Sequence, residues 1–147
     1  METYKQMKDR HQAEVNALPL AFAFSAEQLK EVLSAWNISE EEAIAGAITP
    51  IGHGGYIRTT EKELVNSTFK RIQEERQAAI EADTTGTGYI FQGLKYELIN
   101  HEYSYTGDAT EAIEAVGLTE EDLKREPVQA ALKRATREVM GADPFDE

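Results

Sequence analysis

One histidine and three carboxylates lie close together near the middle of the chain, and they are the side chains best suited to chemistry. Glu97 and His101 are four residues apart, so they share one face of a predicted helix. Glu102 is the next residue, and Asp108 follows a short turn. One imidazole and three carboxylates form a ligand set that a divalent metal accepts. The alternative needs no metal, because a histidine near a helix end can interact with the helix dipole and Asp108 can cap the next helix.

A glycine-rich loop is a second and weaker candidate, in this case for binding an anion. His53, Gly54 and Gly55 precede a short predicted strand that ends at Arg58. Backbone N–H groups in such turns can cradle an anion. The loop has neither the Walker pattern nor the Gly-x-Gly-x-x-Gly fingerprint of dinucleotide sites. An ordinary turn leading into a strand is therefore the alternative.

Enzymatic catalysis has little support in the sequence. The chain has no cysteine, and no Gly-x-Ser-x-Gly elbow surrounds a serine. The acidic runs at 40–42 and 120–122 follow predicted helix caps, where the helix dipole alone explains them. We therefore expect a non-enzymatic protein with no catalytic residues and no cofactor.

Length and composition predict a single compact domain over residues 1–147. A chain of 147 residues can bury a core without disulfides, and its hydrophobic fraction of 41% is ordinary for a globular protein. No apolar run reaches the ~18 residues of a membrane span, and the first ten residues lack the apolar core of a signal peptide. We expect a cytoplasmic protein without membrane contact, with a frayed tail at 143–147.

The net charge of −12 is distributed unevenly. Residues 1–73 carry ten acids and eight bases, a balance of −2, whereas residues 74–147 carry seventeen acids and seven bases, a balance of −10. An acidic surface repels phosphate backbones, so we expect no direct nucleic-acid binding. The same surface can occupy a basic groove on another protein, although it can also serve only solubility.

Apolar periodicity and capping pairs predict a mostly α fold with a minor sheet, in the α+β sense. Strands around 20–24 and 56–58 are expected to pair as a two-stranded sheet, because neither can satisfy its backbone alone. Helix starts are expected where a capping side chain precedes a carboxylate or amide by three residues, at Ser25, Ser39, Thr60, Asp108 and Thr119.

The segment 86–108 contains four of the six tyrosines. Tyrosine is enriched in protein interfaces, because it buries much area at little cost in side-chain entropy. Acids beside tyrosines could receive arginines from a partner through ion pairs and cation–π contacts. Two of the tyrosines could equally cover the core. The predicted partner-binding surface consists of Glu97, His101, Glu102, Tyr103, Tyr105 and Asp108.

Several strings resemble an uncharacterised family of small acidic proteins from Firmicutes phages and mobile elements. They are the residues at 10–19, 22–25, 54–58, 96–103 and 106–108. The family has no established activity, so the resemblance implies a setting and no mechanism. A small acidic protein in that setting fits an inhibitor of a host defence protein, such as an anti-CRISPR protein acting on a nucleic-acid-guided nuclease, by analogy alone.

These observations leave three functional hypotheses open. The first is a non-enzymatic acidic binding protein that blocks a basic, nucleic-acid-binding site on a protein partner. The second is a metal- or small-ligand-binding domain centred on Glu97, His101, Glu102 and Asp108. The third is a structural or regulatory accessory module, such as a homodimer built on the tyrosines.

Overall fold

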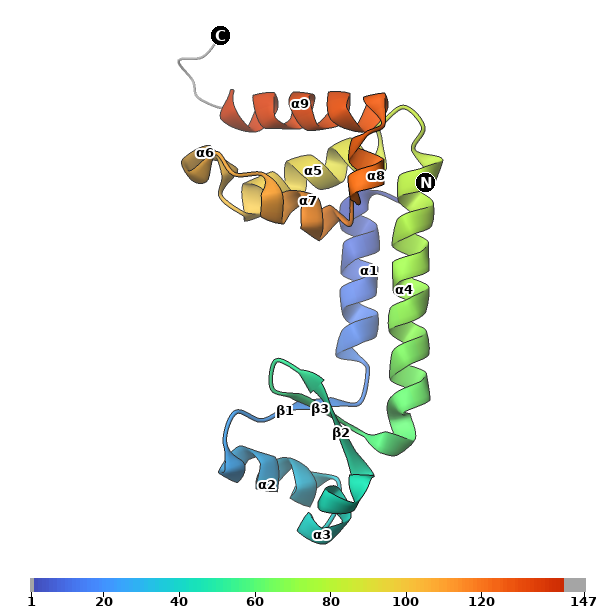
Figure 1. Ribbon diagram of the computed structural model, residues 1–147, viewed down its shortest axis with the longest axis vertical. Coiled ribbons are helices and arrows are strands. Elements are labelled where there is room, and N and C mark those ends of the chain that lie inside the picture. The colour runs from blue at the N-terminus through green and yellow to red at the C-terminus, as the bar shows by residue number, and fades with distance from the viewer. Residues whose placement is uncertain (1, 142–147) are drawn as a thin grey trace. The chain divides into compact units, whose positions relative to one another are not determined.

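Helix α1 (Tyr4–Asn16) and helix α4 (Lys62–Ala82) each contribute residues to two units of the structure. The computed structural model describes residues 2–141 and is shown in Figure 1. Residues 12–72 form one unit, here called the sheet unit, and residues 1–11 with 73–147 form the other, the helical unit. The tail expected at 143–147 lies outside the described residues.

The sheet unit contains a three-stranded antiparallel sheet, one strand more than the sequence predicts. Its strands are β1 (Leu20–Phe22), β2 (Ile48–Gly52) and β3 (Gly55–Arg58), in the order β1-β3-β2. The strand missed from the sequence is β2, which contains Pro50 and ends at Gly52. Proline is tolerated because β2 is an edge strand, where a missing N–H removes no central ladder bond.

Short helices and turns complete the sheet unit. Helix α2 (Ala26–Ala35) begins at Ser25, whose side chain accepts a hydrogen bond from the Gln28 backbone. Helix α3 (Glu40–Glu42) begins with the predicted capping box between Ser39 and Glu42, and a π turn at Ala43–Ala47 continues it. A 3-10 turn at Thr59–Glu61 leads into α4. The buried apolar residues of this unit are Ala23, Leu33, Ile57, Val65 and Ile72.

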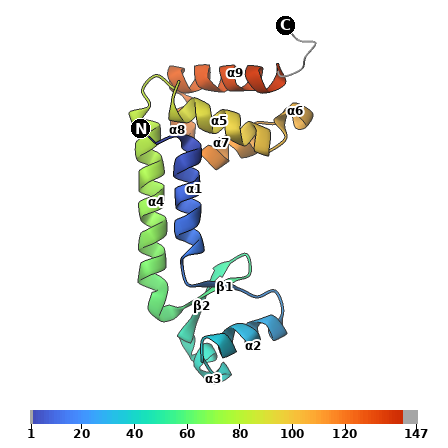
Figure 2. The same cartoon turned by 180° about the vertical axis from the view of Figure 1, so that it is seen from behind.

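The helical unit is built around α5 (Tyr89–Asn100), which lies between α7 (Thr110–Val116) and α9 (Glu126–Met140) in both views of the ribbon (Figures 1 and 2). The short helices α6 (Tyr103–Thr106) and α8 (Glu120–Leu123) complete it. Its core holds the fully buried apolar side chains Ile90, Leu94, Leu98, Ala112, Val116, Val128 and Ala135. The fold is therefore mostly α with a minor sheet, as the sequence predicts.

A glycine inside α5 allows the N-terminal helix to approach closely. A Cβ added at Gly93 would lie 2.8 Å from the Tyr4 ring and 3.2 Å from Val116. The Tyr4 ring therefore packs directly against the α5 backbone, where it is 4% exposed. Tilted ring contacts at 5.2 Å to Tyr89 and 5.8 Å to Tyr96 surround it. Two of the tyrosines in the 86–108 segment thus pack around the core.

The capping box that opens α8 gives a first testable expectation. The Thr119 hydroxyl accepts a hydrogen bond from the Asp122 backbone, while the Asp122 carboxylate accepts from the Thr119 backbone and hydroxyl. Thr119→Ala should lower the free energy of unfolding by about 1 kcal/mol, since orphan N–H groups at the helix start lose their acceptor. Urea denaturation measures the loss, and Thr119→Ser, which keeps the hydroxyl, should retain most of the stability.

Candidate functional site

The loop before α5 fixes the position of the start of α5. The Asp83 carboxylate accepts backbone hydrogen bonds from Gly86 (3.1 Å), Gly88 (3.2 Å) and Ile90 (2.9 Å). One carboxylate thereby satisfies several of the N–H groups that a helix start leaves without partners. Arg125 donates to the Asp83 carbonyl at 3.3 Å from the other side of the loop. The loop is consequently tied to both α5 and the start of α9.

Glu97 is buried, in contrast to the sequence prediction that it belongs to a partner-binding surface. It is 1% exposed, and its carboxylate accepts two hydrogen bonds from Lys8 Nζ, at 2.6 and 3.0 Å. The same ammonium lies 5.1 Å from the centre of the Tyr96 ring. A partner protein cannot reach this carboxylate. Glu97 therefore stabilises the fold and does not belong to the predicted partner-binding surface.

His101 and Glu102 end α5 and turn the chain into α6. His101 Nδ1 lies 3.2 Å from a carboxylate oxygen of Glu111, a residue of α7. Glu102 has a left-handed backbone, with φ of 56°, an uncommon conformation for a residue with a side chain. This turn leaves the Glu102 side chain exposed.

The two tyrosines of α6 have different environments. Tyr103 is half-buried and packs against the core of the helical unit. Tyr105 is 89% exposed, more than any other large apolar or aromatic residue that the structure describes. Of the tyrosines predicted to bind a partner, Tyr105 is the one that presents a full aromatic face to solvent.

Asp108 lies just before the start of α7, but the N-cap is Ala109 and not Asp108 as the sequence predicts. The Asp108 carboxylate accepts a 2.9 Å hydrogen bond from the Thr110 backbone at the start of α7. The Thr110 hydroxyl and backbone N–H hold the pKa of the Asp108 carboxyl below its usual range. The carboxylate is therefore ionised at neutral pH, and the Asp108 side chain remains exposed.

Together these residues form an acidic surface around α6 and the start of α7. Between Lys95 and Lys124 the sequence contains no Lys or Arg. The α6–α7 surface, as it is called below, consists of the exposed residues Glu102, Tyr105, Asp108, Glu111 and Glu114. It therefore has no Lys or Arg within its own chain segment.

The four residues considered as a metal site are not assembled into one. Within residues 2–141, no group of three or more His, Asp or Glu side chains is arranged to hold a metal ion. Glu97 interacts with Lys8, and His101 with Glu111. Asp108 accepts from the Thr110 backbone. Glu97, His101 and Asp108 thus each have a different partner.

The glycine-rich loop does not gather its anion-binding candidates either. Gly52, His53 and Gly54 form the tip of the β2–β3 hairpin, and all three have positive φ. Arg58 ends β3, so at ~3.4 Å per residue it lies about 10 Å along the strand from Gly55. Its guanidinium lies over the Trp36 ring, with the two centres 5.4 Å apart. The hairpin tip and Arg58 are separate features.

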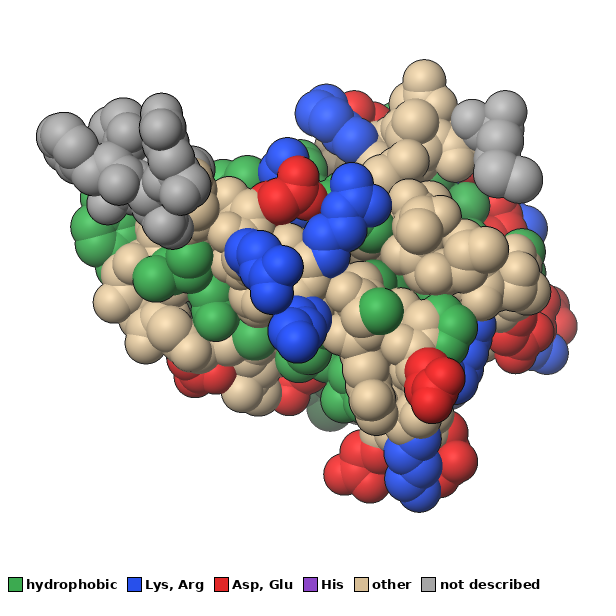
Figure 3. Space-filling view, turned by 90° about the horizontal axis from the view of Figure 1, so that it is seen from above, with side chains coloured by type: hydrophobic (Ala, Val, Ile, Leu, Met, Phe, Trp, Pro, Cys, Tyr) green, Lys and Arg blue, Asp and Glu red, His purple; other side chains and the backbone are tan. Residues whose placement is uncertain are grey.

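Basic side chains of the helical unit gather elsewhere, on the face that Figure 3 views. Helix α9 contributes exposed Lys133, Arg134 and Arg137. Arg134 lies over the Phe91 ring at 3.9 Å. The acids of the α6–α7 surface and these bases of α9 thus lie on different elements.

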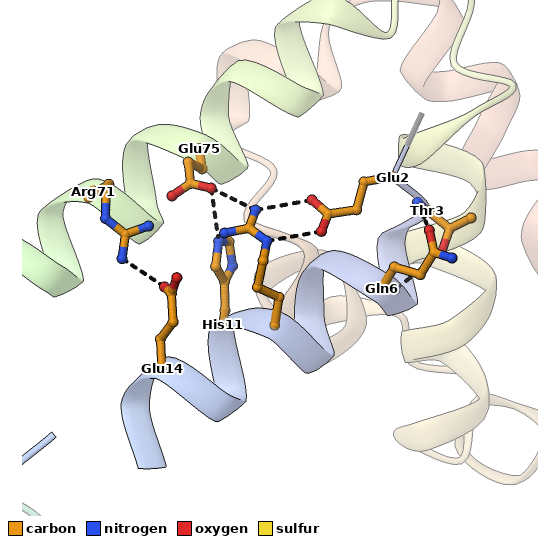
Figure 4. Close-up of polar contacts among 8 residues, drawn as sticks. Glu2, Thr3, Gln6, His11, Glu14, Arg71 and Glu75 are labelled. Carbon is orange, nitrogen blue, oxygen red and sulfur yellow. Dashed lines mark hydrogen bonds and ion pairs between the residues drawn. The ribbon is translucent and has the colours of Figure 1, made fainter. Parts of the chain in front are cut away.

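A polar network between α1 and α4 was not foreseen from the sequence (Figure 4). The Arg10 guanidinium contacts the carboxylates of Glu2 and Glu75, and His11 Nε2 lies 3.6 Å from the same Glu75. The Arg10 hydrogen bond lowers the pKa of Glu2. Because the partners are 65 residues apart, no local pattern could have revealed this network.

The fold and its surfaces define a small, mostly α protein with exposed acids and one exposed tyrosine around α6 and the start of α7. The chain belongs to the family of unknown function DUF7659, whose model matches residues 3–138. An uncharacterised family is thus confirmed. No curated protein and no solved structure matches the chain. Each helix between residues 2 and 141 is too short or too polar for a membrane span.

Proposed function

We propose that this protein is a non-enzymatic binding protein that uses the α6–α7 surface to occupy a basic site on a protein partner. The observation that carries the proposal is the combination of four exposed carboxylates with a tyrosine that is 89% exposed. Tyrosine is enriched in protein interfaces, because it buries much area at little cost in side-chain entropy. A tyrosine close to acids in the chain is suited to arginine, which can form both an ion pair and a cation–π contact.

The partner's chemistry follows from this surface. A cluster of arginines and lysines complements the carboxylates, and such clusters occur where proteins bind nucleic acids. We therefore propose that the protein competes with a nucleic acid for its partner. The resemblance to phage and mobile-element proteins extends the proposal to a host defence protein, such as a nucleic-acid-guided nuclease, in the manner of an anti-CRISPR protein.

Charge reversal on the α6–α7 surface tests the proposal. Glu102→Lys, Asp108→Lys and Glu111→Lys combined should weaken partner binding by about tenfold or more and slow association, because complementary charge steers the encounter. Tyr105→Ala should weaken the same binding through dissociation. The partner is first captured from bacterial lysate on immobilised protein, and purified partner is then measured by surface plasmon resonance at two salt concentrations.

A matched control variant makes the same change in net charge on the sheet unit, outside the α6–α7 surface. Glu27→Lys, Glu31→Lys and Glu63→Lys lie on exposed positions of the sheet unit and should leave binding and its salt dependence unchanged. Circular dichroism verifies that both triple variants are folded. Equal affinity of the two triple variants for the partner, or binding that is indifferent to salt, would contradict the proposal.

A further inference from the structure

A small cavity in the helical unit lies apart from the α6–α7 surface. It has a volume of about 320 Å³ and is formed by the start of α1, the end of α4 and the loop that precedes α5. Met7, Ala79, Ala82 and the Tyr89 ring supply apolar wall. Its size falls at the lower end of the range for small-molecule sites. The cavity therefore suits a ligand of about one ring.

The wall formed by the loop is rigid before any ligand arrives. The Asp83 carboxylate accepts three hydrogen bonds from backbone N–H groups of the loop and of α5. Arg125 donates a further hydrogen bond to the Asp83 backbone carbonyl. Gly86 lies so close to the Pro127 backbone that a Cβ added at Gly86 would clash with it. A preformed wall lowers the entropic cost of binding, because little has to be ordered.

The polar groups around the cavity indicate the charge of its ligand. Among the described residues that line it, Glu2 and Asp83 carry negative charge, and none is Lys or Arg. Each Glu2 oxygen accepts one hydrogen bond from Arg10, at 2.9 and 3.0 Å, which leaves each oxygen a second lone pair. Thr84 and Thr85 add hydroxyls. An anionic ligand would face carboxylates, whereas an ammonium group would find acceptors.

We propose that this cavity binds a compact organic amine. The apolar body of the ligand packs against Ala79, Ala82 and Tyr89, and its ammonium group donates to Glu2. The site is independent of the α6–α7 surface, since the two share no residue.

Three small probes of one shape test the site on full-length, isotopically labelled protein. They are benzylamine, benzyl alcohol and phenylacetate, which differ in charge. Benzylamine should shift the Ala79 and Ala82 methyl resonances and the Thr84 and Thr85 amides in a saturable manner. Benzyl alcohol should bind about tenfold more weakly, because it forms no charge-assisted hydrogen bond. Phenylacetate should not saturate.

Cavity-filling variants test whether benzylamine binds in this cavity and not elsewhere on the protein. Ala79→Leu fills the cavity and should abolish benzylamine binding, whereas Ala78→Leu, an exposed neighbour on the same helix, should not. Ala82→Leu gives a second filled cavity if the first variant fails to fold. Glu2→Gln should reduce benzylamine binding to the level of benzyl alcohol. The proposal is overturned if benzylamine does not saturate, if phenylacetate binds equally well, or if both folded leucine variants bind as Ala78→Leu does.

Discussion

Replacing Lys8 by methionine is expected to lower the free energy of unfolding of the helical unit by about 3 kcal/mol, within the range for breaking a buried ion pair. Glu97 is 1% exposed, and Lys8 supplies its two shortest hydrogen bonds. Without Lys8 the carboxylate keeps, among residues 2–141, only a 3.4 Å contact to the Asn100 amide. A buried charge with so little compensation is costly, and the cation–π contact between Lys8 and Tyr96 is lost with it.

The two partners of this pair should not respond equally. The Lys8 side chain is 40% exposed, so water can solvate its ammonium if Glu97 becomes glutamine. Glu97→Gln should therefore cost less than Lys8→Met. Replacing both residues by methionine should restore most of the stability, because well-packed apolar groups often match a buried ion pair.

Urea denaturation followed by circular dichroism, with hydrogen exchange of the α5 amides, measures these differences. Lys5→Met is the matched control, since Lys5 pairs with Asp9 on the exposed face of the same helix. Such an exposed surface pair contributes little to stability. A Lys8→Met variant no less stable than Lys5→Met would show that the burial of Glu97 carries no such cost.

Local sequence signals account for much of the fold. The boxes at Ser39 and Thr119 open the helices α3 and α8 as predicted, because a cap depends on residues three apart. The predicted box at Asp108 does not form: Ala109 is the N-cap of α7, and Glu111 pairs with His101. The sequence does not predict strand β2, because Pro50 argues against a strand. Proline is accepted in β2 because this strand pairs with β3 at the edge of the sheet.

The candidate site was predictable in position but not in every residue. Glu97 lies seven residues after Ile90 and three after Leu94, so helical spacing places it on the apolar face of α5. The burial of Glu97 could therefore be predicted from the helical spacing of the apolar residues. Its partner Lys8 is 89 residues away, and nothing local identifies it. Glu102 and Asp108 could be placed next to helix ends because turn chemistry is local, although the cap itself is Ala109.

Gly86→Ala is expected to lower the free energy of unfolding by about 3 kcal/mol, from two effects that add: left-handed strain and overpacking. Gly86 has φ of 72°, a conformation that L side chains rarely adopt. An added Cβ would also lie 2.9 Å from the carbonyl carbon of Pro127, in closer contact still with its oxygen. Backbone at the start of α9 cannot rotate away as a side chain can.

Gly107→Ala separates the two effects. Gly107 has a similar φ of 66°, but an added Cβ would meet nothing within 4 Å. It should therefore show the strain alone, about 1 kcal/mol. Both variants are compared by urea denaturation, and the Gly86 variant should also speed hydrogen exchange at Ile90, whose amide depends on the loop through Asp83. Equal losses in the two variants would mean that the loop before α5 moves away from α9 freely, and the rigid cavity wall inferred from its contacts would then be wrong.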